Sequence, residues 1–188
     1  MNDELLRKRY FVVRNFIESW KADDLAEQFD SFARTNPEKS SQKDDVEKSF
    51  AFYNFKPFVG LMLDKLPDLE KLVGSELFPT YSFARIYENE AVLTVHKDRP
   101  ACEVSVTLNL NQDKDWDIWF AKGLEPDDTK DYVNLKPGDA CIYLGSHVWH
   151  ARDPYEGNYY TQTFLHYVFR NGLNSDELFD NKELLAGG

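Results

Sequence analysis

TYSFARIYENEAVLTVHKDRP, residues 80–100, is the stretch of sequence that decides the fold of this chain. Two β-prone runs, Tyr81–Glu88 and Ala91–Lys97, meet there at the turn signal Glu88-Asn89-Glu90. Similar runs follow, separated by turn residues: Glu103–Asn111, Asp117–Ala121, Tyr132–Leu135, Ala140–Leu144, Val148–Arg152 and Tyr159–Phe169. Eight short strands without intervening helices predict an antiparallel sandwich, barrel or jelly roll, because parallel strands would need crossover helices.

The segment before the strands has a mixed character. Tyr10–Val13 is a short β-prone run, and apolar residues at helical spacing predict a helix over about residues 18–35. The polar stretch 36–48 predicts an exposed loop. A second helix is expected over Pro57–Leu77, with a break or kink at Pro67.

These patterns predict one mainly β (α+β) domain over residues 1–188. Residues 1–79 supply a strand and supporting helices, residues 80–170 form the β-rich core, and residues 171–188 form a tail. A short helix is expected in that tail around Leu178, Phe179, Leu184 and Leu185. A chain of 188 residues and 21.9 kDa is long enough to bury a core without disulfides or metal.

The composition excludes several functional classes. The net charge of -11 argues against nucleic acid as a partner, since phosphates attract basic surfaces. The aromatic content of 15% excludes a disordered chain. Cys102 and Cys141 are too few for a disulfide framework, and we expect two buried, reduced thiols. With no signal-peptide pattern and no apolar run of about 20 residues, the sequence predicts a cytoplasmic protein without a membrane partner.

The four histidines, His96, His147, His150 and His166, all lie among the predicted strands. His96 and Asp98 are two residues apart, so on a strand their side chains point to one face. A third ligand from a distant strand would complete two histidines and one carboxylate. This donor set suits Fe(II) and leaves coordination positions open. We prefer His150 to His147 as the third ligand, because His147 follows the turn signal Gly145-Ser146.

Several segments together resemble a known family. They are Phe83–Tyr87, Leu93–Asp98, Leu135–Tyr143 with its Pro137-Gly138-Asp139 turn, His150–Arg152 and Gln162–Tyr167. In order and spacing they are similar to the double-stranded β-helix (jelly-roll, cupin-like) core of Fe(II)/2-oxoglutarate-dependent oxygenases, especially the prolyl-4-hydroxylase-like branch. The resemblance covers about residues 80–170.

The resemblance implies that His96, Asp98 and His150 are both the catalytic residues and the metal ligands. Fe(II), 2-oxoglutarate and O₂ would be the cofactor and co-substrates, and succinate and CO₂ the co-products. The expected activity is that of an oxidoreductase, a dioxygenase that hydroxylates a C–H bond of a protein side chain (prolyl is one candidate) or of a small molecule. Asp98 favours hydroxylation over halogenation, which would need that coordination position for halide.

The far carboxylate of the co-substrate needs a cation and hydroxyl groups. Members of the family usually carry Arg or Lys about ten residues after the distal histidine, where this chain has Tyr159, Tyr160 and Gln162. Among the basic residues nearby, we rank Arg152, two residues after His150, above Arg85.

Three further residues complete the expected cofactor-binding set. Tyr87 matches a tyrosine that contacts the 2-oxo acid in the family. Gln162 and His166 share one face of the last strand, because their separation is even. If that face points inward, they lie beside the metal or the co-substrate, although for His166 a core histidine is the preferred interpretation.

Two alternatives stay open. A non-catalytic cupin-like protein that binds a metal or ligand would also explain the histidines and the absence of a basic residue at the usual position. A nucleic-acid demethylase of the same superfamily is disfavoured by the net charge. The substrate is not readable, although the acidic surface favours a basic peptide or a cationic small molecule. The loop 36–48 and the segment 122–131 are candidates for the substrate rim.

Overall fold

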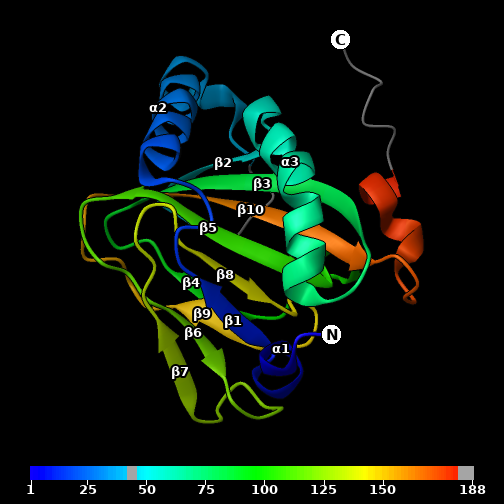
Figure 1. Ribbon diagram of the computed structural model, residues 1–188. Coiled ribbons are helices and arrows are strands. Elements are labelled where there is room, and N and C mark those ends of the chain that lie inside the picture. Colours follow the sequence, from blue (N-terminus) through cyan, green and yellow to red (C-terminus); the bar gives the residue numbers. More distant parts are fainter. Residues whose placement is uncertain (42–45, 182–188) are drawn as a thin grey trace.

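The computed structural model describes residues 1–41 and 46–181 (Figure 1). Its helices are α1 (Asp3–Lys8), α2 (Ser19–Thr35) and α3 (Lys56–Val73), with short 3₁₀ turns η1 (Pro37–Lys39), η2 (Pro100–Cys102) and η3 (Ser175–Asn181). Its strands are β1 (Tyr10–Val13), β2 (Ser49–Tyr53), β3 (Leu77–Glu88), β4 (Leu93–His96), β5 (Val104–Gln112), β6 (Ile118–Ala121), β7 (Lys130–Val133), β8 (Ala140–Tyr143), β9 (His150–Arg152) and β10 (Tyr159–Phe169).

The strands form two antiparallel sheets. The larger sheet has the order β1-β8-β5-β10-β3-β2, and the smaller one has the order β4-β9-β6-β7. The strands from β3 to β6 alternate between the sheets, and so do those from β7 to β10, while β6 and β7 are neighbours in the smaller sheet. This arrangement is that of a jelly roll. The expected mainly β jelly-roll class is therefore confirmed, and each of the eight strands predicted in its core is present.

Alternation along β10 sets the two faces of the larger sheet. Leu165 and Tyr167 are fully buried in the core against the helices. Their neighbours Gln162, Phe164 and His166 face the opposite way, toward the smaller sheet. Because side chains alternate along a strand, one face of β10, which carries Gln162 and His166, points between the sheets, while the other face packs against the helices. The space between the sheets is thus where a polar site can form.

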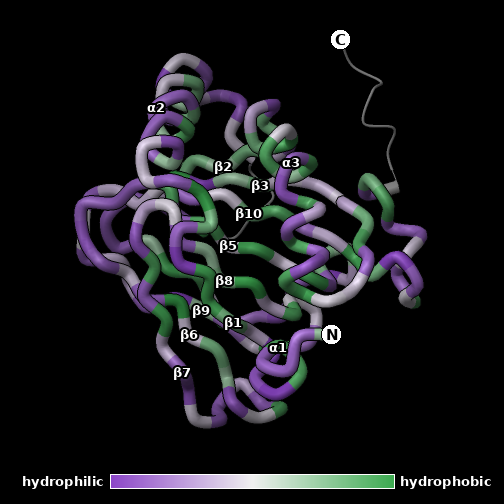
Figure 2. Tube along the Cα trace, in the orientation of Figure 1, coloured by the Kyte–Doolittle hydropathy of each residue, from purple (hydrophilic) through white to green (hydrophobic). Residues whose placement is uncertain are grey.

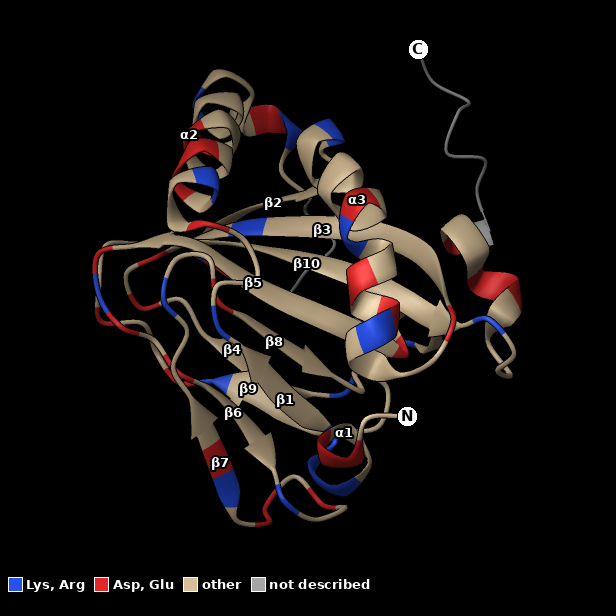
Figure 3. Ribbon diagram, viewed as in Figure 1, with Lys and Arg blue, Asp and Glu red and all other residues tan. Residues whose placement is uncertain are grey.

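Helices α2 and α3 cover the outer face of the larger sheet (Figure 1). Hydrophobic residues follow the strands and the inner sides of these helices (Figure 2). Phe29 and Phe58, one from each helix, are fully buried there. Charged residues gather on the outer turns of the helices and on loops (Figure 3). The expectation of helices that support the sheet agrees with this arrangement.

Some local expectations were wrong. Pro67 neither ends nor breaks α3, which runs uninterrupted to Val73. The carbonyl that loses its helical partner at Pro67 belongs to Leu63, which is 42% exposed, so water can hydrogen-bond to it. The sequence patterns also missed α1 and β2, and β2 lengthens the larger sheet beside β3.

The sequence also led us to expect a loop at 36–48, a helix in the tail and two buried cysteines. The expected loop 36–48 contains η1, and its residues 42–45 lie outside the described residues. The predicted tail helix was wrong at Leu178 and Phe179, whose backbone dihedrals inside η3 are not helical, and Leu184 and Leu185 lie outside the described residues. Cys102 and Cys141 are free and buried, as expected. None of the helices in the described part of the chain is both long and apolar enough to cross a membrane.

Candidate metal centre

His96 and His150 are brought together by strand pairing. They are direct antiparallel partners at the end of β4 and the start of β9. Their ring centroids are 4.3 Å apart. Asp98 follows two residues after His96, and its Oδ1 lies 3.4 Å from Nε2 of His96 and 3.5 Å from Nε2 of His150. The three side chains predicted as metal ligands therefore converge on one point.

The backbone fixes which nitrogen of each imidazole is available. Nδ1 of His96 lies 2.7 Å from the carbonyl of Thr94, and Nδ1 of His150 lies 3.1 Å from the carbonyl of Val148. A carbonyl only accepts hydrogen bonds, so each Nδ1 must carry the proton. In the neutral imidazole each Nε2 is then the unprotonated nitrogen, through which the ring can bind a metal.

Asp98 lies just beyond the end of β4 and is held by the loop after β8. Its amide donates to the carbonyl of Gly145 at 2.9 Å, and its Oδ2 accepts the Ser105 hydroxyl at 3.1 Å. A Cβ atom on Gly145 would overlap the Asp98 carboxylate and would come within 2.6 Å of the carbonyl of Cys102. Glycine is therefore needed at position 145 because other groups approach it so closely.

Electrostatics keep His150 and Asp98 in their ligating forms and favour the protonated form of His96. Burial lowers the pKa of His150 to about 4, so this imidazole is neutral near pH 7. Burial also lowers the pKa of His96, but its hydrogen bond and attraction to Asp98 outweigh burial and raise it. Burial raises the pKa of Asp98, yet its interactions with His150 and His96 dominate and lower it. Asp98 is thus ionised across the physiological range.

A second set of possible donors shares Asp98. Atoms of Asp98, Cys102 and His166 also lie within 4.8 Å of one another. The Ser105 hydroxyl, however, lies 2.9 Å from Nδ1 of His166, and the Tyr81 hydroxyl lies 3.0 Å from Sγ of Cys102. These contacts satisfy the second set with partners inside the protein. The His96, Asp98 and His150 set is the better metal centre.

The metal centre opens into a cavity of about 300 Å³ between the sheets. Arg85 and Tyr87 from β3 line it, and so does His166 from β10. Aromatic and apolar side chains form the rest of the wall. These are Phe83, Leu93, Tyr143 and Phe164, with Val46 and Thr94.

Two of the expected cofactor-binding residues lie behind this cavity. Arg152 and Gln162 are at most 1% exposed and are not among the lining residues. Arg152 donates to Gln162 Oε1 at 3.0 Å, and Gln162 Nε2 donates to the Tyr87 hydroxyl at 3.1 Å. His147 is exposed and contacts Ser146, so it lies away from the centre.

The sequence analysis missed Ser105, which contacts both Asp98 and His166. A signal was present in β5, whose sequence VSVTLNLN alternates strictly between apolar and polar residues. Three of its four polar members, Ser105, Thr107 and Asn109, are fully buried. Buried polar residues on one face of a strand indicate an internal polar site.

Comparison with protein-family models and with curated protein sequences found no match. Solved structures do match. A prolyl-4-hydroxylase from Pseudomonas putida shares 14% identity at a TM-score of 0.67, over 90% of this chain and 97% of that one. HygX from Streptomyces hygroscopicus, solved with nickel and 2-oxoglutarate bound, shares 14% identity at a TM-score of 0.64, over 87% of this chain and 84% of that one.

A third similar structure comes from Burkholderia pseudomallei and is described as an oxidoreductase of the 2OG-Fe(II) oxygenase family. It shares 13% identity at a TM-score of 0.67, over 91% of this chain and 89% of that one. At such low identity the likeness establishes the architecture and not the activity. The chain has the double-stranded β-helix fold of these oxygenases.

Proposed function

We propose that this protein is an Fe(II)- and 2-oxoglutarate-dependent dioxygenase that hydroxylates a C–H bond. The observation that carries the proposal is the convergence of His96, Asp98 and His150 at the cavity between the two sheets. Two imidazoles and one carboxylate that face a common point match the donor set of Fe(II) oxygenases. Structures with the same fold include one solved with iron and one with nickel and 2-oxoglutarate bound.

The residues present fit such a metal. His96 and His150 would each bind through Nε2, and Asp98 through Oδ1, since these atoms already face one another. When bound, Fe(II) with 2-oxoglutarate and O₂ supplies the oxidising chemistry that hydroxylates the substrate and releases succinate and CO₂. The Ser105 hydroxyl holds the other oxygen of Asp98, so the carboxylate keeps one orientation.

Arg85 is the better partner for the far carboxylate of the co-substrate. It lines the same cavity as the metal ligands, whereas Arg152 lies behind the wall. Its guanidinium group packs over the rings of Phe83 and Tyr87, at 5.2 and 5.5 Å from their centroids. A guanidinium group binds a carboxylate through two parallel hydrogen bonds. This reverses our ranking from the sequence, which placed Arg152 first.

The aromatic and apolar wall would exclude water from the reacting groups. Phe83 and Phe164 stack with centroids 6.0 Å apart on the side of the cavity formed by the larger sheet. Leu93, from the smaller sheet, lines the opposite side of the cavity. Such a wall strengthens the electrostatic interactions that position a charged co-substrate.

We propose that the primary substrate is a peptide side chain or a small molecule. One similar structure is a prolyl-4-hydroxylase, and another holds hygromycin B.

The test is an anaerobic titration with Fe(II) and then 2-oxoglutarate, followed through the weak visible charge-transfer band of a chelated 2-oxo acid. We expect the band in the parent protein, its loss in His96→Ala, and its retention in the control His147→Ala. Arg85→Gln should weaken 2-oxoglutarate binding without affecting Fe(II) binding.

The alternative of a non-catalytic, cupin-like binding protein gives a different result. Fe(II) would bind with an affinity that depends on His96, but 2-oxoglutarate would add no band and no affinity. That outcome would contradict the proposed activity while leaving the metal centre in place. Loss of Fe(II) binding in His147→Ala but not in His96→Ala would refute the centre itself.

A further inference from the structure

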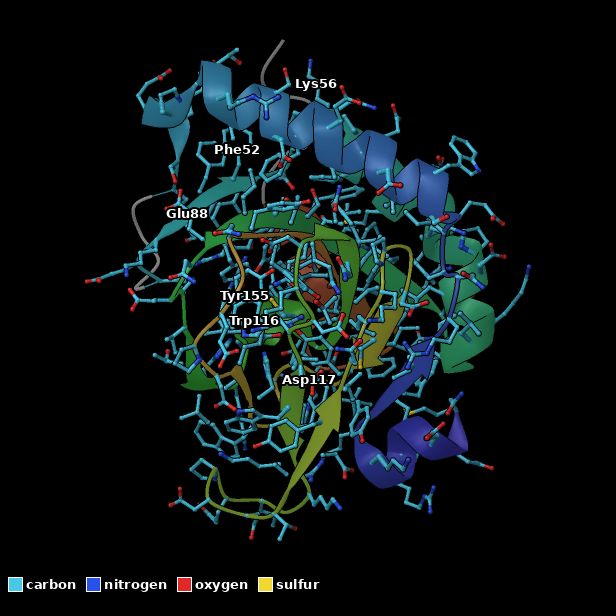
Figure 4. The ribbon with its side chains drawn as sticks, turned by 90° about the vertical axis from the view of Figure 1, so that its left-hand side faces the viewer. Phe52, Lys56, Glu88, Trp116, Asp117 and Tyr155 are labelled. Carbon is cyan, nitrogen blue, oxygen red and sulfur yellow. The ribbon has the colours of Figure 1, made fainter. Side chains whose placement is uncertain are left out.

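A second cavity, of about 670 Å³, lies on the outer face of the larger sheet. It is formed between the C-terminal half of α2 and the ends of β2, β3, β5 and β10. In Figure 4, Glu88 is labelled at the end of β3, and α2 runs above it. We call this space the outer cavity and define it by Asp30, Arg34, Phe50, Ile86, Glu88 and Tyr159.

Strand register builds the floor of the outer cavity. Thr161 of β10 pairs with Asn111 of β5 on one side and with Ile86 of β3 on the other. Ile86 pairs in turn with Phe50 of β2. Side chains of directly paired residues share one face of a sheet, so these four form a row across it. The Thr161 hydroxyl donates to Asp30 of α2, which shows that the row faces the helix.

The sheet itself separates the outer cavity from the metal cavity. Ile86 lines the outer cavity, whereas its sequence neighbours Arg85 and Tyr87 line the metal cavity. Successive side chains of a strand point to opposite faces of the sheet. A ligand in the outer cavity would therefore occupy a site distinct from the metal centre.

Asp30 brings a poorly compensated negative charge into the outer cavity. Its Oδ1 accepts the Thr161 hydroxyl at 3.2 Å, and within residues 1–41 and 46–181 no cationic group lies at ion-pair distance from it. Burial raises the pKa of Asp30, and the Thr161 hydrogen bond and the attraction of Arg34 offset this only in part. Removing a carboxylate from water without a cationic partner is costly. A cation that entered the cavity would relieve this cost.

The rest of the cavity combines apolar surface with a second carboxylate. Phe50 and Ile86 supply the apolar surface, and Glu88 stands at the rim. Arg34 is the cation in the wall, but its side chain is exposed, whereas Asp30 is half-buried. Solvent and salt screen an exposed charge more than a buried one. The deep end of the cavity therefore favours a cation, and the net charge of -11 acts in the same direction.

We propose that the outer cavity binds a small amphipathic organic cation, whose charged group pairs with Asp30 while its apolar body packs on Phe50 and Ile86. Ligand sites are commonly concave, mostly apolar and fitted with a few polar groups that fix orientation. A planar amidinium or guanidinium group can form two parallel hydrogen bonds to one carboxylate. The inference goes beyond the proposed function and does not depend on it, because none of these residues belongs to the metal centre.

Three probes of one shape and different charge test the inference. Benzamidine is cationic, benzamide neutral and benzoate anionic, and each is titrated into the ¹⁵N-labelled full chain with Zn(II) added to fill the metal centre. We expect benzamidine to shift backbone amides of α2 and of the ends of β3 and β10, with a dissociation constant of about 1 mM for so small a ligand. Benzamide and benzoate should bind about tenfold more weakly or not at all.

Asp30→Asn keeps an acceptor for the Thr161 hydroxyl but removes the charge. We expect it to weaken benzamidine binding about tenfold and to leave benzamide binding unchanged. The matched control is Asp23→Asn, which removes the same charge from the exposed surface of α2, about two turns away. It should change the benzamidine constant less than about twofold, because salt screens charges at that separation. Should Asp30→Asn fail to fold, Glu88→Gln at the rim should weaken binding about twofold.

Three results would overturn the inference. The first is equal binding of benzamidine and benzamide to the parent protein, which would show that charge plays no part. The second is a set of shifts confined to residues that line the metal cavity. The third is an equal benzamidine constant in Asp30→Asn and Asp23→Asn. The first two need no variant, so the inference can be refuted on the parent protein alone.

Discussion

Gly145→Ala is the sharpest test of how the fold holds the metal centre. A Cβ atom at this position would overlap the Asp98 carboxylate and would lie 2.6 Å from the Cys102 carbonyl and 2.7 Å from the Ser105 hydroxyl. An ordinary van der Waals contact is about 3.5 Å or more, so the new methyl group intrudes on all three. The Cys102 carbonyl is backbone and yields little. Asp98 is a side chain, so the displacement falls mainly on the carboxylate.

The expected magnitude has two parts. Overpacking of this size costs about 2 kcal/mol of unfolding free energy, or a fall in Tm of about 4–8 °C in a chain of this length. Displacing the carboxylate and its bond to Ser105 should weaken metal binding by about 10- to 100-fold. Differential scanning fluorimetry measures the first quantity, and competition of Fe(II) or Co(II) against a chromophoric chelator measures the second.

Gly60→Ala is the matched control for this substitution. Gly60 lies on the exposed side of α3, and a Cβ atom there meets nothing within 4 Å. Alanine in a helix interior should raise the unfolding free energy by about 1 kcal/mol and leave the metal constant unchanged. If Gly145→Ala lowered Tm but bound metal as tightly as the parent, Asp98 would not be a ligand in the orientation described here.

Two further substitutions and one thiol-labelling reaction test the surrounding fold. Asp139→Ala removes a buried carboxylate that accepts from Arg14 at 2.6 Å and from two backbone amides, and we expect a loss of about 2 kcal/mol in urea unfolding at pH 7. Burial raises the Asp139 pKa, but these donors outweigh it and lower the pKa, so the stabilisation is present above the unfolded pKa of about 3.9 and is lost as pH falls through the folded pKa; a difference between parent and variant that did not shrink as the pH falls through the acid range would contradict this. Tyr167→Phe removes a buried hydroxyl that donates to a backbone carbonyl of α3 at 2.8 Å, and should lower Tm by about 2–4 °C, whereas an unchanged Tm would show that this bond adds nothing. Cys102 and Cys141 are at most 2% exposed, and burial raises the pKa of both thiols. A thiol reagent should therefore label them only after denaturant is added. Rapid labelling of the native protein would show that the interior opens.

The strands from β3 to β10 could be predicted from the sequence because their period of two and their turns are local signals. The run after Pro137-Gly138-Asp139 is an example. Gly138 has a φ of 91°, which favours glycine, and Asp139 caps the turn by accepting the amide of Lys136. Strand β2 was missed because its pairing with β3 is a long-range contact that leaves little local trace.

The metal centre was also within reach of the sequence, because His96 and Asp98 lie two residues apart beside a strand end. The choice of His150 over His147 could be made from the turn that precedes them. The positions of Arg85 and Arg152 could not. Both lie on strands that face the space between the sheets, and only packing shows that one lines the cavity while the other lies behind Gln162.

The sequence by itself determined the antiparallel class, the positions of the core strands along the chain and the residue types of the metal centre. Those features depend on alternation, turn chemistry and short spacings, which are properties of neighbouring residues. Only the tertiary structure decided the pairing of His96 with His150, the approach of Gly145 to Asp98 and the hydrogen-bond chain from Arg152 to Tyr87. Each of these joins residues from different strands, so it exists only when the two sheets have closed over one another.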